Sequence, residues 1–279
     1  MASICSVCGT KLPMLGRLTG ASLCRSCDAE AKQARQTATE DYNQLLSQLT
    51  NAPERVAELQ PLLSPVAERA DLRGEQLTQL HYTALESLLE RALDDDHLTA
   101  DEEERINDIV NALDIASTFW TRFATWKPRV FVARCNDGRL PVLPSPSIML
   151  KKEEVAHMET DAALMKEVVH REYVGGYSGM SFRVMKGVRF HTGGTRGKSV
   201  VTGTSLEVAD TGTLTVTSQR AVYTGARQTI EMAYAKLLNL NVFDDGVRFH
   251  LSNRKNPPLF RLDAGVGNAV AAAINAACQ

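Results

Sequence analysis

Four of the six cysteines lie within the first 27 residues, in two pairs of identical spacing, Cys5-x2-Cys8 and Cys24-x2-Cys27. A pair separated by two residues forms a knuckle that points two sulfur atoms at one centre, and two knuckles supply the four thiolates of a tetrahedral zinc site. Because four protein ligands leave no open coordination position, the spacing predicts one structural Zn2+ ion per chain, in a zinc ribbon over residues 1–30. Disulfide bonds and a redox-active Cys-x-x-Cys pair are the alternatives; a leaderless chain with two matched pairs favours metal over both.

The composition is that of a globular protein. The chain has 279 residues, of which 44% are hydrophobic and 23% charged, and no apolar run approaches the roughly 18 to 20 residues that cross a bilayer. The first residues carry no signal-peptide pattern, so we expect a cytoplasmic protein, with peripheral attachment to a membrane left open. Residues 1–180 hold 19 Lys and Arg against 27 Asp and Glu, whereas residues 181–279 hold 12 against 6. This asymmetry indicates separate modules, the second suited to an anionic partner, unless each domain simply has its own charge.

The segment from Asp28 to about Trp126 is predicted to be helical. It is rich in Ala, Leu, Glu, Gln and Arg and contains one glycine. Prolines at 53, 61 and 65 are expected to break it, and leucines between Leu72 and Leu93 recur at helical spacing. Thr99 and Glu102 form a capping box for a further helix.

The acidic turn Asp94–Asp96 precedes this capping box. It fails the EF-hand pattern, because Thr99 and Arg105 stand where that loop needs glycine and glutamate. A solvated helix start and a weak cation site both stay open. The acidic turn, the Leu98-Thr99 pair and the acidic cluster that follows resemble the TerB-like helical domain of bacterial tellurite-resistance proteins, over Leu72 to Leu113. The resemblance implies an all-α domain, placed at residues 31–136. A second acidic turn of that family is missing, so no metal site is carried over from it.

The composition changes after about Asn136, where Asp137-Gly138 and prolines at 141, 144 and 146 mark a linker. Asp244-Asp245-Gly246 between two alternating runs predicts a hairpin, and Asp263 is expected to cap a helix over Ala264–Ala277. The strands predicted from β-branched and alternating runs are Ser181–Lys186, Val188–His191, Val200–Thr204, Thr213–Thr217, Arg220–Thr224, Thr229–Met232, Leu237–Val242, Val247–Leu251 and Leu259–Leu262.

The run from Gly212 to Tyr223 resembles the central hairpin of bacterial PH and GRAM-like domains, in which a G-x-L-x-x-T-x-x-R sequence precedes an aromatic strand. The block Arg171–Val188 is similar to a segment of uncharacterised bacterial PH-like proteins. Together the two resemblances cover roughly Ile148 to Cys278, and they imply a pleckstrin-homology-like β-barrel capped by a helix at residues 137–279. The expected fold class is therefore multidomain α+β: a zinc ribbon, an all-α middle domain and a PH-like barrel.

A basic segment is the best indication of function. Ser181–Leu206 contains no acidic residue, and its glycine-rich loop, Thr192–Ser199, misses the P-loop pattern by one residue. In PH domains that bind phosphoinositides the first hairpin loop offers Lys and Arg to phosphates, so the resemblance implies an anion or lipid site here; a solvated cationic surface is the alternative. The candidate residues are Arg183, Lys186, Arg189, Arg196 and Lys198, with His191 beside them.

No local catalytic pattern appears, and the six histidines are scattered. We therefore expect a non-enzymatic adaptor or sensor that docks on a protein partner or an anionic membrane surface, with no small-molecule substrate. The resemblance to bacterial proteins assembled from such modules implies a role in stress response or antiviral defence. A nucleic-acid-associated regulator is the alternative, since zinc ribbons often bind nucleic acid, but this ribbon has few cations and no interleaved aromatic residues. Cys135 and Cys278 have no matching partners and are expected to be buried or incidental thiols.

Overall fold

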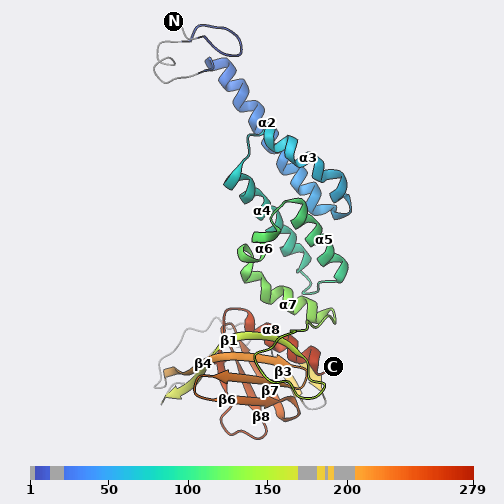
Figure 1. Ribbon diagram of the computed structural model, residues 1–279, viewed down its shortest axis with the longest axis vertical. Coiled ribbons are helices and arrows are strands. Elements are labelled where there is room, and N and C mark those ends of the chain that lie inside the picture. Colours follow the sequence, from blue (N-terminus) through green and yellow to red (C-terminus); the bar gives the residue numbers. More distant parts are fainter. Residues whose placement is uncertain (1–3, 13–21, 169–180, 186–187, 192–204) are drawn as a thin grey trace. The chain divides into compact units, whose positions relative to one another are not determined.

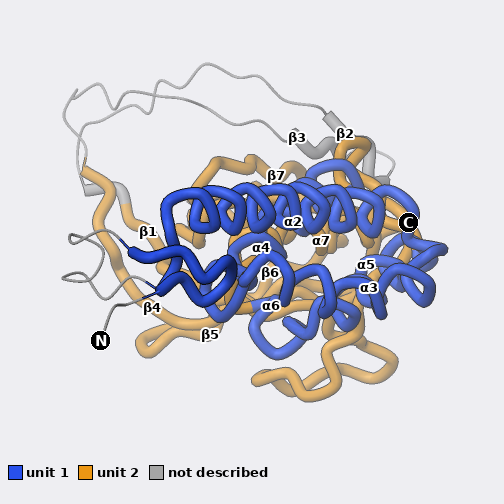
Figure 2. The backbone as a smooth tube through the Cα atoms, turned by 90° about the horizontal axis from the view of Figure 1, so that it is seen from above, with its two compact units in different colours: residues 1–92, 100–120 blue, residues 93–99, 121–279 orange. Residues whose placement is uncertain are grey.

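The computed structural model describes residues 4–12, 22–168, 181–185, 188–191 and 205–279. The chain divides into two compact units (Figure 2), one formed by residues 1–92 and 100–120 and the other by residues 93–99 and 121–279. The fold is mixed α+β: the described residues form seven α-helices and a nine-stranded sheet. The first unit is helical, and the second contains the sheet (Figure 1).

The helices of the first unit confirm the predicted helical region. Tyr42, Leu45 and Leu49 form the buried face of the longest helix, which packs on the two helices that follow it. The last of the predicted helices begins at Ala100, directly after Thr99, as the capping pattern requires. The elements are α2 (Arg25–Asn51), η1 (Pro53–Arg55), α3 (Val56–Arg69), α4 (Gly74–Ala92), α5 (Ala100–Ala112) and α6 (Ala116–Arg122).

One expectation about the prolines is wrong. Pro61 and Pro65 lie inside α3 and do not break it. Leu59, Leu63 and Ala67 of this helix are buried at helical spacing, and burying such a stripe offsets the backbone hydrogen bonds that the two prolines remove.

A buried histidine joins two helices of this unit. His81 of α4 is 7% exposed, and its Nε2 lies 2.7 Å from the hydroxyl oxygen of Tyr42 on α2. Burial lowers the pKa of His81, against the opposing effect of a hydrogen bond to the backbone of Leu113. The imidazole is therefore neutral in the folded protein at neutral pH.

The first unit is expected to lose stability in mild acid because of His81. Its folded pKa lies below the unfolded value of about 6.5, so the unfolded chain takes up the proton first as the pH falls below that value. The urea midpoint of the helical transition should fall between pH 7.5 and 5.5. A His81→Asn variant should start lower and lose this pH dependence, whereas His97→Gln, at an exposed position, should keep it. An unchanged wild-type midpoint over this range contradicts the expectation.

The second unit begins earlier than the sequence indicated. Helix α7 (Lys127–Asn136), preceded by η2 (Ala124–Trp126), packs against the C-terminal helix α8 (Val266–Ala277). The predicted boundary at residues 136/137 thus falls inside this unit.

Side chains from α7 and the residues after it also hold the turn at residues 93–99. Arg129 Nη2 donates to the Leu93 carbonyl at 2.6 Å, Asn136 Nδ2 donates to the Asp96 carbonyl at 2.8 Å, and Arg139 donates to the Leu98 carbonyl. These carbonyls follow the end of α4, where the helix no longer supplies backbone donors, so the side chains complete the turn. This explains why the acidic turn groups with the second unit.

The sheet consists of seven strands in antiparallel order and one additional two-stranded hairpin. Its strand order is β2-β3-β7-β8-β9-β1-β4-β5-β6. The pairs from β7 to β6 in this order are all antiparallel, whereas β3 joins the edge of β7 in parallel. The strands are β1 (Ala156–Val168), β2 (Ser181–Met185), β3 (Val188–His191), β4 (Ser205–Thr217), β5 (Arg220–Gly225), β6 (Thr229–Ala233), β7 (Leu237–Phe243), β8 (Gly246–Leu251) and β9 (Leu259–Arg261), with η3 (Tyr234–Lys236) between β6 and β7.

Two strand predictions need correction. Strand β1 was not expected, and β4 starts at Ser205 instead of Thr213. The two strands pair from Ala156↔Thr217 to Val168↔Ser205. Charged residues in these two segments obscure the alternating pattern by which a strand is recognised in a sequence. The long antiparallel ladder between the strands supplies the stabilisation that local β propensity does not. The predicted strand Val200–Thr204 lies outside the described residues.

The predicted hairpin and helix of the C-terminal part are present, but the residue that caps the helix differs from the prediction. The hairpin turn is confirmed, with Phe243 paired to Gly246. Asp263 does not cap α8: the N-cap residue is Gly265, whose φ of 79° is readily available to glycine. Helix α8 places Val270, Ala273 and Ile274 in the same core as the buried side chains of the sheet.

The G-x-L-x-x-T-x-x-R residues each have a structural role around the β4–β5 turn. A Cβ at Gly212 would lie 2.1 Å from the Thr224 carbonyl oxygen, so only glycine fits there. Leu214 is fully buried. The hydroxyl of Thr217 accepts a hydrogen bond from the Arg220 N–H at 3.1 Å and closes the turn.

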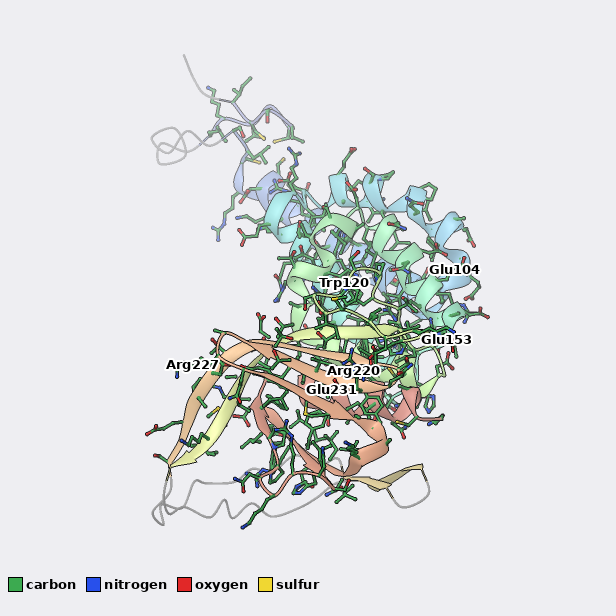
Figure 3. The ribbon with its side chains drawn as sticks, turned by 60° about the horizontal axis from the view of Figure 1, so that its bottom comes forward. Glu104, Trp120, Glu153, Arg220, Arg227 and Glu231 are labelled. Carbon is green, nitrogen blue, oxygen red and sulfur yellow. The ribbon has the colours of Figure 1, made fainter. Side chains whose placement is uncertain are left out.

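Arg220 completes this motif by an ion-pair network with two glutamates. Figure 3 labels Arg220 and one of these partners, Glu231. Its guanidinium donates to both carboxylate oxygens of Glu154, at 2.8 and 3.0 Å, and to Glu231 at 2.8 Å. It also donates to the Met149 carbonyl at 3.0 Å. The side chains of Arg220 and Glu154 are 10% and 0% exposed. The network therefore ties the segment before β1 to strands β5 and β6.

Candidate metal centre

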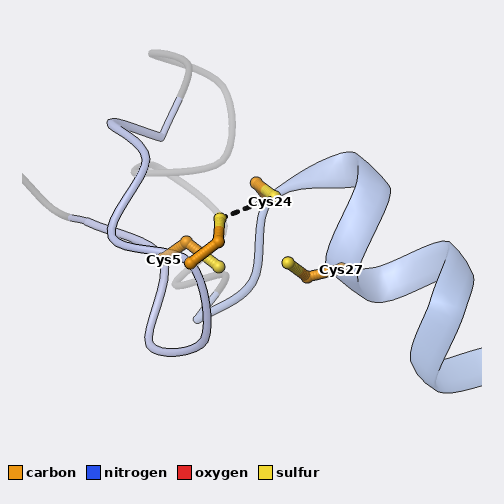
Figure 4. A group of neighbouring side chains, drawn as sticks. Cys5, Cys24 and Cys27 are labelled. Carbon is orange, nitrogen blue, oxygen red and sulfur yellow. Dashed lines mark hydrogen bonds between the residues drawn. The ribbon is translucent and has the colours of Figure 1, made fainter.

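The four paired cysteines come together at the N-terminal end of α2 (Figure 4). The sulfur atoms of Cys5, Cys8, Cys24 and Cys27 all lie within 4.8 Å of one another. Two of them, Cys8 and Cys24, are 3.6 Å apart. Tetrahedral zinc with Zn–S bonds of about 2.3 Å requires sulfur separations of about 3.8 Å. The cluster thus has the dimensions of a four-sulfur metal site. In the part of the chain that the structure describes, it is the one such grouping of ligand atoms found.

The first knuckle is a closed turn built by local backbone bonds. The Gly9 N–H donates to the Cys5 carbonyl at 3.0 Å, and the Cys5 N–H donates to the Thr10 carbonyl at 2.8 Å. Gly9 has a φ of 71°, which explains the glycine after the second cysteine of the pair. An isolated antiparallel bridge between Ile4 and Lys11 closes the turn.

The second knuckle is the start of a helix. Cys24 is the N-cap residue of α2 and Cys27 lies in its first turn. The Ser6 N–H donates to the Ser22 carbonyl at 2.9 Å and joins the two knuckles. The N-terminus of a helix carries partial positive charge and unpaired N–H groups, both of which favour thiolate over thiol.

The local hydrogen bonds favour thiolate at two of the four positions. The backbone N–H of Cys8, followed by those of Cys24 and Val7, lowers the pKa of Cys5 to about 6. The Thr10 side chain, 3.2 Å from the Cys8 sulfur, is the main cause that lowers the pKa of Cys8. Hydrogen bonding with the Cys24 side chain raises the pKa of Cys27 instead. The cluster therefore holds both protons and negative charge, and a bound cation would displace the remaining protons.

Packing closes the site on one side. Cys5 and Cys27 are buried with Leu12, and Leu23 packs against them. Cys8 is exposed. Four sulfur ligands occupy all positions of a tetrahedral ion, so this arrangement suits a structural metal and leaves no place for a substrate. All six cysteines are free, and Cys135 and Cys278 lie outside the cluster.

The second predicted site is described only in part. Arg183 lies on β2, and Arg189 and His191 lie on β3. Lys186, Arg196 and Lys198 lie outside the described residues. The grouping of these cations into one anion site thus stays a prediction.

Sequence reasoning missed two other features. The first is the Arg220–Glu154 ion pair. The arginine of the motif was visible in the sequence, but nothing in the sequence around Glu154 identifies Arg220 as its partner. A row of polar side chains on β7 and β8 was also missed, although Asn239 and Asn241 alternate with buried Leu240 and Val242.

The chain was compared with protein-family models, curated proteins and solved structures, and none matches it. Among the described residues, no helix combines the length and the apolar character needed to cross a membrane. The functional argument therefore depends on this chain's own residues.

Proposed function

We propose that this protein is a non-enzymatic adaptor in which one structural Zn2+ ion holds an N-terminal ribbon and a C-terminal PH-like domain docks on an anionic membrane surface. The observation that carries the zinc assignment is the convergence of four sulfur atoms within 4.8 Å. An all-thiolate tetrahedral set favours zinc over hard cations such as magnesium and calcium, which prefer oxygen.

The PH-like assignment of the second unit is supported by topology. Seven antiparallel strands are followed by one C-terminal helix that packs into their core. The residues that carry the resemblance stand at a tight turn, where Gly212, Thr217 and Arg220 each have a structural partner. These features are those that a PH-like barrel capped by a helix requires.

Charge supports docking on an anionic surface. Residues 181–279 hold 12 Lys and Arg against 6 Asp and Glu, while the rest of the chain is acidic. Ser181–Leu206 has no carboxylate. Each basic residue close to an anionic membrane contributes about 1 kcal/mol, so one domain binds weakly and binding weakens as salt screens the charges.

Liposome co-sedimentation tests this proposal. The full chain is expected to sediment with vesicles that contain anionic lipid at low salt, and to lose binding as the salt concentration rises. An Arg196→Ala/Lys198→Ala variant should bind at least several-fold less. The matched control is Arg69→Ala/Arg73→Ala, which removes the same charge from two exposed positions of the first unit. Equal sedimentation of both variants and wild type, or no binding at low salt, would discard membrane docking and leave a protein partner.

A further inference from the structure

The four cysteines of the N-terminal cluster differ in their access to solvent. Cys8 is exposed and Cys24 is partly exposed, whereas Cys5 and Cys27 are buried. The two buried cysteines pack with Leu12 in a small apolar core. The two cysteines that water reaches therefore come one from each knuckle, while the other member of each knuckle is protected.

The turn around Cys8 is open. Val7, which directly precedes it, is 73% exposed. Gly9 follows it, and apart from the adjoining residues no heavy atom of the described chain lies within 4 Å of the position that a Cβ would take there. A small reagent in solution can thus approach Cys8 without displacing other side chains.

The two accessible sulfur atoms are also neighbours. Cys8 Sγ and Cys24 Sγ lie 3.6 Å apart. A disulfide bond is about 2.05 Å long, so the two atoms need to approach by only about 1.5 Å to form one. A bond within either knuckle would instead use a buried cysteine, Cys5 or Cys27. Exposure and distance therefore select the same pair, which links the two knuckles.

We propose that Cys8 and Cys24 are an oxidisable pair, which a hydroperoxide converts to a disulfide so that the site releases its metal. This rests on the structural zinc of the proposed function and adds a redox response to it. A cysteine that ligates zinc is a thiolate, and the thiolate is the form of cysteine that attacks peroxides.

The reaction takes place in two steps. The Cys8 sulfur attacks one oxygen of hydrogen peroxide: an S–O bond forms, the O–O bond breaks, and the other oxygen leaves as water after taking a proton from solvent. The Cys24 sulfur then attacks the sulfenic acid at Cys8, the S–S bond forms, and the second oxygen leaves as water with a second proton. The two thiolates give up two electrons, and the peroxide accepts them.

Oxidation removes two of the four ligands. The remaining sulfur atoms, those of Cys5 and Cys27, cannot complete the tetrahedral set that a structural zinc site requires. The new bond would still tie the first knuckle to Cys24, the N-cap residue of α2. A dithiol reductant restores both thiols by exchange, so metal release should be reversible.

The first test is a peptide map of the full zinc-loaded chain after treatment with hydrogen peroxide. Free thiols are alkylated before tryptic digestion under denaturing conditions. Trypsin places the four cysteines on three peptides: residues 1–11 carry the first pair, residues 18–25 carry Cys24 and residues 26–32 carry Cys27. We expect peptide 1–11 linked to peptide 18–25, with fragmentation placing the bond on Cys8 and alkylation on Cys5. A bond within peptide 1–11, a bond to Cys27 or four alkylated cysteines overturns the proposal.

The second test measures zinc release with a coloured chelator. Wild type should release its zinc as peroxide is added and take it up again after dithiothreitol and fresh Zn2+. Three cysteines and one histidine also form structural zinc sites, so Cys8→His and Cys24→His each keep four ligands but lack one thiol of the pair. Both should release zinc roughly tenfold more slowly than wild type. The control Cys135→Ala/Cys278→Ala removes the two cysteines outside the cluster and should release zinc at the wild-type rate.

Zinc content before oxidation separates this inference from the proposed function. A histidine variant that holds zinc and releases it at the wild-type rate overturns the oxidisable pair and leaves the structural zinc in place. Where neither histidine variant retains zinc, the wild-type peptide map decides. A wild-type chain that holds no zinc but forms the Cys8–Cys24 bond keeps the oxidisable pair, and removes the zinc assignment and with it the metal release.

Discussion

Replacing Cys27 with serine is expected to abolish zinc binding and to unfold the N-terminal segment together with the first turns of α2. Cys27 is one of the four clustered cysteines and is buried against Leu12. Structural zinc contributes an apparent binding free energy of about 10–16 kcal/mol in small zinc domains, and in such domains this is also the free energy of folding. Among the described residues, the knuckles are otherwise joined by the Ser6–Ser22 backbone hydrogen bond and by the packing of Leu12 and Leu23.

The effect should extend into the helix. Between Cys27 and Ala38 no residue of α2 is buried, so this stretch has little tertiary support. Isolated helical turns are marginal in water, and the cysteine cluster lies at the start of this helix. Without the ion we expect α2 to fray as far as the region of Ala38, where packing against the other helices begins.

Metal analysis and tryptic digestion measure both effects. Wild type should contain one zinc per chain, and Cys27→Ser should contain little. Cleavage after Lys32 and Arg35, both in the unsupported stretch, should become much faster in the variant. Cys278→Ser removes a cysteine outside the cluster, and should retain full zinc and slow cleavage. Wild type without bound zinc, when purified without chelator, would falsify the assignment. Zinc loss with unchanged cleavage would show that α2 needs no metal.

Replacing Arg220 with leucine is expected to destabilise the second unit by about 3–5 kcal/mol, because it leaves the carboxylate of Glu154 buried without its partner. Glu154 has a fully buried side chain and receives two of the guanidinium bonds. The loss corresponds to a decrease in melting temperature of roughly 10 °C for a unit of this size. Arg227→Leu is the control, since Arg227 is exposed, and its effect should stay within about 0.5 kcal/mol.

A double-mutant cycle tests whether the pair itself is responsible. Arg220→Leu combined with Glu154→Gln should recover part of the lost stability, because no unpaired charge remains buried. Thermal melting of the single and double variants measures the coupling. If the two substitutions add without recovery, the cost of Arg220→Leu comes from lost packing and not from an unpaired carboxylate.

The Arg220–Glu154 pair also predicts that the second unit loses stability in acid. Burial by itself raises the pKa of Glu154, but hydrogen bonds from Arg220, the Lys151 N–H and Thr217 outweigh it and lower the pKa to about 2. A carboxyl group with a depressed folded pKa stabilises the fold above its ordinary pKa, which is about 4.5. This stabilisation is lost as the pH falls from there towards about 2.

The sequence alone determined the four-cysteine cluster, because its information is local. A two-residue spacing forces two sulfur atoms into one turn, and Gly9 completes the first of these turns. Most of the helical first unit was also predictable, since apolar residues recur at helical spacing in α4 and α5. The hairpin at Asp244–Gly246 followed from turn chemistry in the same way.

Tertiary structure decided what depends on partners far along the chain. Strand β1 exists because it pairs with β4 some fifty residues later, and α7 joins the second unit because α8 packs against it. Glu154 forms an ion pair with Arg220, which lies 66 positions later in the sequence. The polar side chains of β7 and β8 likewise become neighbours only through the strand register, since Asn239 and His250 are eleven positions apart in the sequence and lie opposite each other once the two strands are paired. Period and spacing describe one element at a time, whereas which elements meet depends on long-range burial and hydrogen bonding that no short window of sequence contains.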